Sequence, residues 1–231
     1  MYRKVICALD TGDLDVALNI ASRIGPKIGA FKIGHALTLR HGLDVIPRLQ
    51  DAGASRVFLD LKFHDIPNSV ALAVREAARH NVWMMTLHIA GGPAMVTAAV
   101  EEAKNAGENA PLLVGVSVLT SIDQGMLTDF MGVDRPLLDY MVYLSKHGVD
   151  CGLDGVVCSP NEIAAIRGWV GPSAVIVTPG IRLGASTDDQ KRVGSPTQAL
   201  EDGADYLVVG RALIDAPDVD QALASLGISE A

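Results

Sequence analysis

The stretch Val57-Phe58-Leu59-Asp60-Leu61-Lys62-Phe63-His64-Asp65-Ile66-Pro67 runs from apolar residues into a cluster of charges and then into a turn. Its apolar beginning predicts a buried strand, in which successive side chains point to opposite faces, so Asp60 and Lys62 share one face. Pro67 fits the first turn of a helix, which puts Asp65 in the loop before it. The stretch therefore predicts a strand, a loop and a helix, with charged residues at the end of the strand.

The charges of Asp60 and Lys62 need an explanation in a buried strand. An unpaired carboxylate or ammonium loses several kcal/mol when it leaves water, so the two groups either pair with each other or serve a reaction. A structural ion pair and a reactive site are both compatible with the spacing. Asp65 follows Lys62 closely enough to take part in either arrangement.

Similar apolar runs occur along the whole chain, with stretches of helical periodicity between many of them. Continuously apolar runs are typical of parallel strands that are buried on both faces. The eight expected strands are residues 5–9, 30–34, 56–62, 82–88, 112–119, 155–159, 174–178 and 206–210, and the clearest helical stretches are 14–24, 37–50, 70–80 and 95–105. Eight strand-helix units predict an α/β protein with a (β/α)8 TIM barrel, and an open doubly wound sheet is the alternative. No linker or low-complexity tract divides residues 1–231, so we expect a single barrel domain.

The composition suits this fold and limits the partners. Hydrophobic residues make up 49% of the 231 residues but aromatic residues only 4%, so the core has to be built from aliphatic side chains. A formal net charge of −8 opposes binding to nucleic acid or to an anionic membrane. An anionic substrate would therefore need local cations.

The sequence also indicates a compartment. Arg3, Lys4 and Asp10 interrupt the N-terminal apolar run, which is too short for a signal peptide, and no run approaches the roughly 18 apolar residues of a membrane span. The three cysteines form no C-x-x-C pair, and an odd count of this kind is commonest in a reducing compartment. We therefore expect a cytoplasmic protein.

Polar residues accompany the ends of all eight expected strands. They are Asp10, Lys32, Asp60 with Lys62, His88, Thr120, Ser159, Arg182 and Arg211. Active sites of TIM barrels lie where the strands end and the following loops begin. Each residue alone has a simpler explanation, such as a helix cap for Asp10 or a hydrogen-bonded core histidine for His88. Together they predict an active site at this end of the barrel.

The last two strands predict a phosphate site. Barrels often hold phosphate with the loops after strands seven and eight and the N-terminus of a short helix. Arg182 follows the seventh expected strand, and Gly210 and Arg211 follow the eighth, where glycine permits close backbone approach and arginine a bidentate contact. Residues 183–193 are small and polar enough for a lid, with Gln190 closing over the ligand.

Other motifs narrow the chemistry by their absence. The sequence has no G-x-G-x-x-G after a strand, no G-x-x-x-x-G-K-[ST], no H-E-x-x-H and no G-x-S-x-G. A metal at Asp60, His64 and Asp65 would face the charge of Lys62, which disfavours a metal site.

A lysine among carboxylates stays protonated, so Lys62 suits proton donation better than Schiff-base chemistry. Its ammonium can stabilise and protonate a carbanion, while a neighbouring aspartate repels a substrate carboxylate. Decarboxylation without a cofactor fits this pattern.

The segment Asp60-Leu61-Lys62-Phe63-His64-Asp65-Ile66-Pro67-Asn68-Ser69-Val70 resembles the signature of the orotidine 5′-phosphate decarboxylase family. Similarity in order and spacing continues through residues 5–10, 31–34, 88, 90–92, 118–121, 178–182 and 208–211. The resemblance implies a cofactor-free (β/α)8 barrel that converts orotidine 5′-phosphate to UMP and CO2, the last step of pyrimidine nucleotide synthesis. Ser69 departs from the threonine that is frequent in the family but keeps a hydroxyl group.

The resemblance also implies roles for single residues. Lys62 would donate a proton to C6 of the pyrimidine, in a charged array with Lys32, Asp60 and Asp65. The implied substrate-binding residues, besides Lys32 and Asp60, are Asp10 at the ribose, Thr120 at the pyrimidine, Arg182, Gln190, Gly210 and Arg211 at the phosphate or its lid, and Ile66 and Ser69 within the signature. The family is homodimeric, and the aspartate that matches Asp65 reaches the active site of the partner.

Two alternatives remain open. The nearer is a metal-assisted relative from the same superfamily, 3-keto-L-gulonate 6-phosphate decarboxylase or hexulose phosphate synthase, which shares an Asp-x-Lys-x-x-Asp strand. Lys32 and Ile66-Pro67 argue against it. The more distant alternative is a barrel that binds a phosphoribosyl ligand without catalysis, and the intact array of lysines and aspartates argues against that.

Overall fold

The apolar runs form eight parallel strands that close into a barrel, as the sequence predicts. A computed structural model describes residues 2–181 and 194–228. Strands that follow one another in the chain lie side by side, and β8 pairs with β1 to close the barrel. The strands are β1 (Tyr2–Leu9), β2 (Ile28–Ile33), β3 (Val57–Phe63), β4 (Met84–His88), β5 (Leu112–Val116), β6 (Gly155–Val157), β7 (Val175–Thr178) and β8 (Tyr206–Val209).

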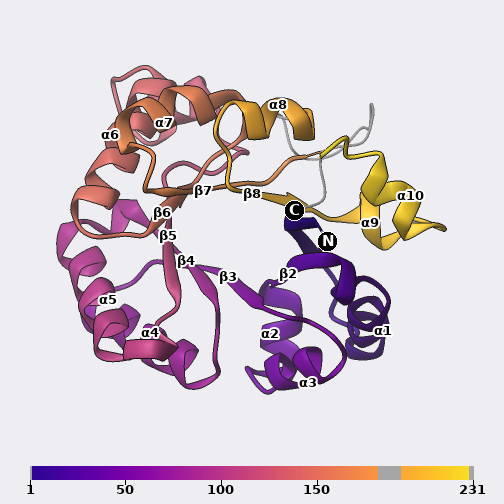
Figure 1. The fold of residues 1–231 in the computed structure, drawn as a ribbon. Helices are drawn as coiled ribbons and strands as arrows, with labels where there is room; N and C mark the ends of the chain where they lie inside the picture. Colours follow the sequence, from indigo (N-terminus) through magenta and orange to yellow (C-terminus); the bar gives the residue numbers. More distant parts are fainter. Residues whose placement is uncertain (1, 182–193, 229–231) are drawn as a thin grey trace.

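Helices surround the barrel and connect its strands (Figure 1). They are α1 (Leu14–Ile24), α2 (His35–His41), α3 (Val45–Asp51), α4 (Pro67–Arg79), α5 (Pro93–Asn105), α6 (Leu137–Asp150), α7 (Ile163–Val170), α8 (Pro196–Glu201), α9 (Arg211–Ile214) and α10 (Val219–Ala224). Short helical turns add η1 (Gly25–Lys27), η2 (Ile89–Gly91), η3 (Gly107–Asn109), η4 (Met126–Phe130) and η5 (Pro160–Glu162). Within the described ranges, no helix has the length and apolar character needed to cross a membrane.

Several boundaries differ from the sequence prediction, and two of these differences have a physical explanation. The expected helix 37–50 is divided into α2 and α3, because Gly42 adopts a left-handed backbone with φ of 69° that ends α2. The expected strand 112–119 ends at Val116, although Val118 beyond it is still buried. An apolar run marks burial, and burial continues here into the loop after the strand.

The core consists of two layers that the strands separate. Side chains on the outer face of the barrel pack against the helices and form the larger cluster, which includes Phe31, Leu59 and Met85. Side chains on the inner face form a smaller cluster that fills the barrel. Phe58 and Met84 belong to this inner cluster and are almost fully buried. The interior of the barrel is therefore a packed core and not a pore.

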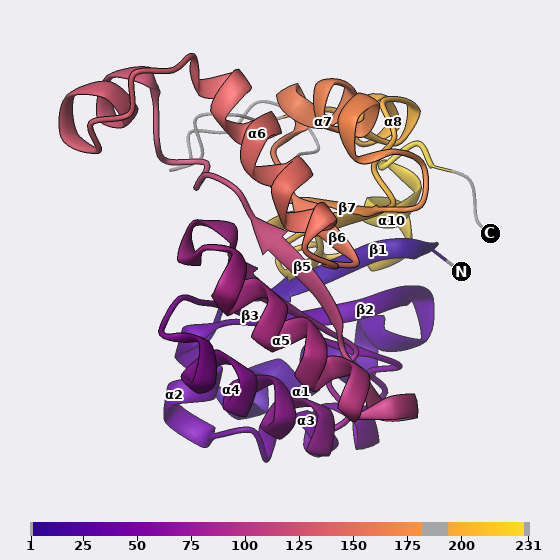
Figure 2. The same ribbon diagram turned by 90° about the vertical axis from the view of Figure 1, so that its left-hand side faces the viewer.

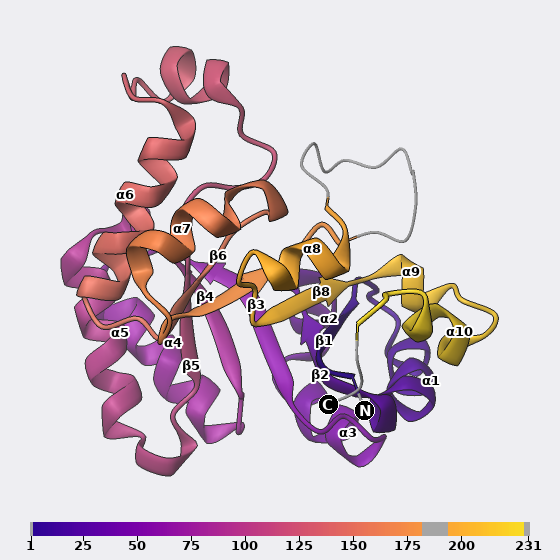
Figure 3. The ribbon, with the colours of Figure 1, turned by 45° about the horizontal axis from the view of Figure 1, so that its top comes forward.

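The connection between β5 and α6 projects from the body of the barrel (Figures 2 and 3). It contains η4, which the sequence analysis did not identify. Phe130 at the end of η4 is 84% exposed, and Met126 and Met131 are also exposed. The projecting segment thus presents apolar side chains to the surroundings.

Candidate active site

The inner face of the barrel changes from apolar to polar toward the ends of its strands. Because side chains alternate along a strand, positions two residues apart point to the same side. The apolar layer is Ala8, Ala30, Phe58 and Met84, and the residues two positions later are Asp10, Lys32, Asp60 and Thr86. Four adjacent strands therefore deliver polar side chains to one place, as the sequence analysis expected for three of them.

These residues and Lys62 form a chain of alternating charges. Lys62 Nζ lies 2.8 Å from Asp60 Oδ1, and Lys32 Nζ lies 3.4 Å from Asp60 Oδ2. Lys32 Nζ is also 3.2 Å from Asp10 Oδ1. The side chain of Asp60 is only 12% exposed, whereas that of Asp10 is 69% exposed. Asp60 and Lys62 therefore pair with each other, within a larger charged array at the barrel mouth.

Asp60 is held in its ionised form. Burial alone would raise the pKa of its carboxyl group, but Lys32 and Lys62 and hydrogen bonds from Lys62 and Thr86 hold this pKa below its usual value. Asp60 is thus a fixed negative charge between two ammonium groups. A carboxylate in this position can hold both lysines and repel a second anion.

Lys62 has an unusual backbone conformation. Its φ is 52°, in the left-handed region that residues other than glycine seldom adopt. The pairing of β3 with β4 is irregular at this point, since Leu59 is opposite Met85 but Phe63 is opposite Leu87. Such a bulge redirects side chains and is frequent beside active sites. The strand is therefore distorted where it presents Lys62.

Thr86 is a site residue that the sequence analysis missed. It is 1% exposed, and its hydroxyl group donates to Asp60 Oδ1 at 3.0 Å and accepts from the backbone N–H of Lys62 at 2.8 Å. The available signal was its position two residues before His88, which puts both on the same face of an otherwise apolar strand.

His88 ends β4 and faces a second histidine. The ring centroids of His88 and His64 are 5.2 Å apart. Burial first, and then Coulombic interactions with His64 and Lys62, hold the pKa of His88 below its usual value. The lowered pKa favours the neutral imidazole form of His88, which suits hydrogen bonding beside the array.

Asp65 lies in the loop after β3. Asp65 is exposed, and its Oδ1 accepts a hydrogen bond from the backbone N–H of Ile66 at 2.7 Å. Ile66 is 66% exposed and caps α4, which begins at Pro67 as the sequence predicted. Ser69 is half-buried in the first turn of α4. Among the described residues, the array joins Asp10, Lys32, Asp60 and Lys62 without Asp65.

The expected phosphate region is only partly described. Gly210 follows β8 and lies near Asp10, since a Cβ added to it would be 3.9 Å from Asp10 Oδ2. Arg211 begins α9 and is exposed, and Thr120 is half-buried in the turn after β5. Arg182, Gln190 and the proposed lid 183–193 lie outside the described residues. The structure thus brings β8 and Asp10 together at the mouth.

The described residues at the mouth can supply acid-base and electrostatic catalysis. Among the described residues, no three His, Cys, Asp or Glu side chains are grouped as metal ligands. A divalent cation at Asp60 would also face the ammonium groups of Lys32 and Lys62. Burial, followed by the charge of Asp10, raises the pKa of the Cys7 thiol to about 12, so Cys7 is unsuited to nucleophilic catalysis.

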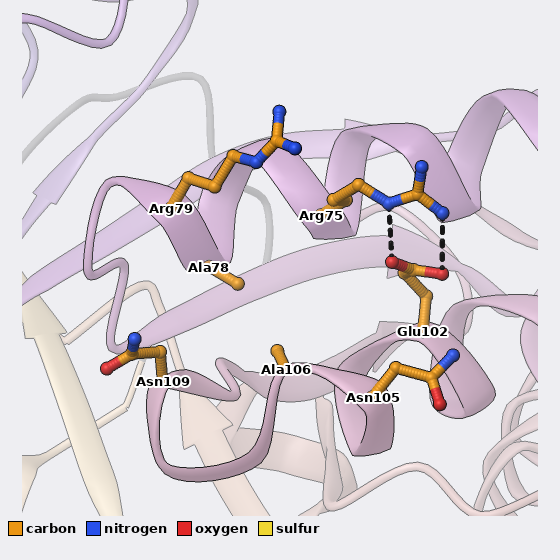
Figure 4. A pocket seen from close by; sticks show the side chains of 7 residues that line it. All are labelled: Arg75, Ala78, Arg79, Glu102, Asn105, Ala106 and Asn109. Carbon is orange, nitrogen blue, oxygen red and sulfur yellow. Dashed lines mark hydrogen bonds and ion pairs between the residues drawn. The ribbon is translucent and has the colours of Figure 1, made fainter.

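A separate groove of about 270 Å³ lies between the last turns of α4 and α5 (Figure 4). Arg75 donates to both carboxylate oxygens of Glu102 there, at 2.6 Å and 3.1 Å. Helices of a (β/α)8 barrel run opposite to its strands, so these helix ends lie far from the mouth that carries the array. The groove is therefore not part of the candidate active site.

Comparisons with known proteins identify the family of the chain. Residues 3–226 match the family described as "Orotidine 5'-phosphate decarboxylase / HUMPS family". An orotidine 5'-phosphate decarboxylase from Syntrophomonas wolfei is 45% identical over 231 residues, which cover 97% of this chain and 96% of the relative. One from Dichelobacter nodosus is 46% identical over 223 residues, 96% of each chain. The crystal structure of orotidine 5'-phosphate decarboxylase from Lactobacillus acidophilus superposes with a TM-score of 0.85 at 32% identity and 97% coverage of each chain. The chain belongs to the orotidine 5'-phosphate decarboxylase / HUMPS family.

Proposed function

We propose that the protein converts orotidine 5′-phosphate to UMP and CO2, with Lys62 supplying the proton that replaces CO2 at C6. Family membership supports the reaction. The observation that carries the mechanism is the ammonium group of Lys62, 2.8 Å from the buried carboxylate of Asp60 at the barrel mouth. The proposed mechanism uses neither a cofactor nor a metal.

The array performs two tasks in this mechanism. Asp60, kept ionised by its neighbours, lies where the substrate carboxylate binds and repels it. When the C–C bond breaks, its electron pair remains on C6 and CO2 leaves. The ammonium of Lys62 stabilises the new negative charge and transfers a proton to C6, and solvent then reprotonates the amine.

The remaining residues bind the substrate. Asp10 holds the ribose and Thr120 contacts the pyrimidine, while Ile66 and Ser69 line the site beside Lys62. Arg211, Gly210, Arg182 and Gln190 bind the phosphate or close over it. The proximity of Gly210 to Asp10 supports a phosphate beside the ribose, because both groups belong to one nucleotide.

The active form is a homodimer in which Asp65 completes the array of the partner. Two observations support this. Asp65 is exposed and turned to the backbone of its own loop, and the adjacent Ile66 presents an apolar side chain that is 66% exposed. A charged residue beside an exposed apolar one is suited to a symmetric interface.

Mixed dimers test the shared site. Lys62→Ala and Asp65→Asn homodimers should both be nearly inactive. A dimer with one chain of each kind has one site in which both residues are intact, so a randomly mixed population should recover about a quarter of the parent activity. If mixing restores nothing while both variants form dimers, Asp65 does not act across the interface.

The proposal includes the domain organisation, the cellular location and the pathway of the enzyme. The barrel is one domain over residues 1–231, and the enzyme acts in the cytoplasm in the synthesis of pyrimidine nucleotides. The net charge of −8 supports a small-molecule substrate over nucleic acid or an anionic membrane surface.

Ultraviolet absorbance of orotidine 5′-phosphate tests the function directly. The purified protein should convert it to UMP in excess chelator, at the same rate as without chelator. The alternative is a metal-assisted sugar-phosphate enzyme of the same family. That alternative is favoured if the folded protein leaves orotidine 5′-phosphate unchanged and consumes 3-keto-L-gulonate 6-phosphate only with magnesium.

A further inference from the structure

Thr86 occupies a central position behind the charged array. It lies on the inner face of β4, two residues before His88, and is 1% exposed. A hydroxyl group has one proton to donate and lone pairs to accept with, and Thr86 uses both functions within the array. Its hydroxyl donates to Asp60 Oδ1 and accepts from the backbone N–H of Lys62.

The two hydrogen bonds of Thr86, together with the hydrogen bond from Lys62 Nζ to Asp60, link Thr86, Asp60 and Lys62 in a cyclic network. Asp60 Oδ1, which accepts from Thr86, is the same oxygen that accepts from Lys62 Nζ at 2.8 Å. The hydroxyl of Thr86 thus contacts the backbone of Lys62 on one side and the anchor of its ammonium on the other. A change at Thr86 would affect both ends of the Lys62 side chain.

The backbone at Lys62 needs such support. A left-handed φ of 52° is unfavourable for lysine, and a residue persists in such a conformation only where its surroundings impose it. The bulge between Leu59 and Phe63 interrupts the regular pairing of β3 with β4. At the interruption, the Lys62 N–H is bonded to a side-chain hydroxyl. That bond ties the distorted segment to β4.

We propose that Thr86 is a positioning residue, which holds the bulge of β3 and the carboxylate of Asp60 so that the Lys62 ammonium points at the reacting carbon. This inference rests on the proposed function of Lys62. Thr86 does not need to touch the substrate, so its removal should lower kcat more than ligand affinity. Misplacement of a catalytic group by about 1 Å can lower a rate about a hundredfold.

Two substitutions separate the hydroxyl from the shape of the side chain. Thr86→Val keeps the branched shape and removes both hydrogen bonds, whereas Thr86→Ser keeps the hydroxyl. We expect kcat to fall about tenfold to a hundredfold in the valine variant, with the Kd for UMP within about threefold of the parent. The serine variant should recover most of kcat. Thr38→Val is the matched control, because the hydroxyl of Thr38 on α2 is buried without a hydrogen-bond partner in the described part of the chain.

A second readout does not depend on turnover. Amide hydrogen exchange of the peptide that contains Lys62 should be faster in Thr86→Val than in the parent, and slow again in Thr86→Ser. If the parent does not decarboxylate orotidine 5′-phosphate, the proposed function fails, while this measurement still tests the structural part of the inference.

Three results would overturn the role of Thr86. The first is a folded Thr86→Val variant with kcat within about twofold of the parent, and the second is a serine variant as slow as the valine variant. The third is unchanged exchange at Lys62 in the valine variant. If Thr86→Val does not fold, Thr86→Ala is compared with Thr86→Ser by the same criteria.

Discussion

Replacing Asp60 by asparagine tests whether its charge holds the array together. Asparagine keeps the shape and one acceptor oxygen, but it removes the negative charge that lies 2.8 Å from Lys62 Nζ and 3.4 Å from Lys32 Nζ. Removing one partner of a buried ion pair costs about 3–5 kcal/mol. Lys62 is 34% exposed, so water compensates for part of the loss, and we expect the lower end, about 3 kcal/mol.

Urea unfolding followed by circular dichroism measures this loss. For a chain of 231 residues, it corresponds to a decrease in Tm of roughly 6–12 °C. Asp10→Asn is the matched control, because Asp10 is 69% exposed and contacts only Lys32, at 3.2 Å, within the array. An exposed ion pair contributes less than about 1 kcal/mol, so the control should remain close to the parent.

The loss of stability caused by Asp60→Asn should be larger at neutral pH than in acid. Burial acts to raise the pKa of Asp60, but the two lysines outweigh it and the net pKa is lowered. Because the pKa of Asp60 is lower in the folded state, its ionised carboxylate stabilises the protein at pH values above the unfolded-state pKa of about 3.9. This stabilisation is lost as the pH falls through the folded-state pKa. The difference between parent and variant should therefore shrink below about pH 4. Equal stability at pH 7, or a difference that stays constant in acid, would refute the reasoning.

Two further predictions concern the strands. A Cβ on Gly155 of β6 would lie 2.0 Å from the backbone oxygen of Val175, so Gly155→Ala should destabilise the barrel by several kcal/mol. Gly168 is an exposed position of α7 where a Cβ would meet no other atom, so Gly168→Ala should stabilise the protein by up to about 1 kcal/mol. Chemical denaturation of both variants checks this, and equal effects would contradict it. His88 has a lowered pKa, so the folded state resists its protonation and loses stability as the pH falls below about 6.5. His88→Gln should lose less stability than the parent between pH 7 and pH 5, and an identical loss in urea titrations would exclude this contribution.

Most of the fold could be predicted from the sequence because the strands contain consecutive buried residues, which lie on both of their faces. That environment selects continuous apolar runs, and all eight runs correspond to strands of the barrel. The ends of the apolar runs do not coincide with the ends of the strands. Residue 118 is apolar because it is buried, although the strand has already ended at Val116.

The site could be predicted only where it depends on local alternation. The shared face of Asp60 and Lys62 follows from their spacing, and the meeting of Asp10 with Lys32 follows from adjacent strand ends. The left-handed backbone of Lys62 and its bond to Thr86 depend on the register between β3 and β4. Register depends on two segments that are distant in the sequence. The backbone conformation of Lys62 and its hydrogen bond to Thr86 therefore could not be predicted from either segment alone. The role of Asp65 in a partner came from resemblance alone, because no pattern within one chain specifies a neighbour.

The central claim is that Lys62 is the proton donor, and the most direct measurement compares Lys62→Ala with the parent in two assays. Turnover of orotidine 5′-phosphate is followed by absorbance, and UMP binding is followed by calorimetry. Lys146→Ala is the control for loss of a lysine charge, because the side chain of Lys146 on α6 is 43% exposed. We predict that Lys62→Ala loses at least about a thousandfold in kcat and remains a folded dimer that binds UMP. A folded Lys62→Ala variant with turnover within about tenfold of the parent would contradict the account.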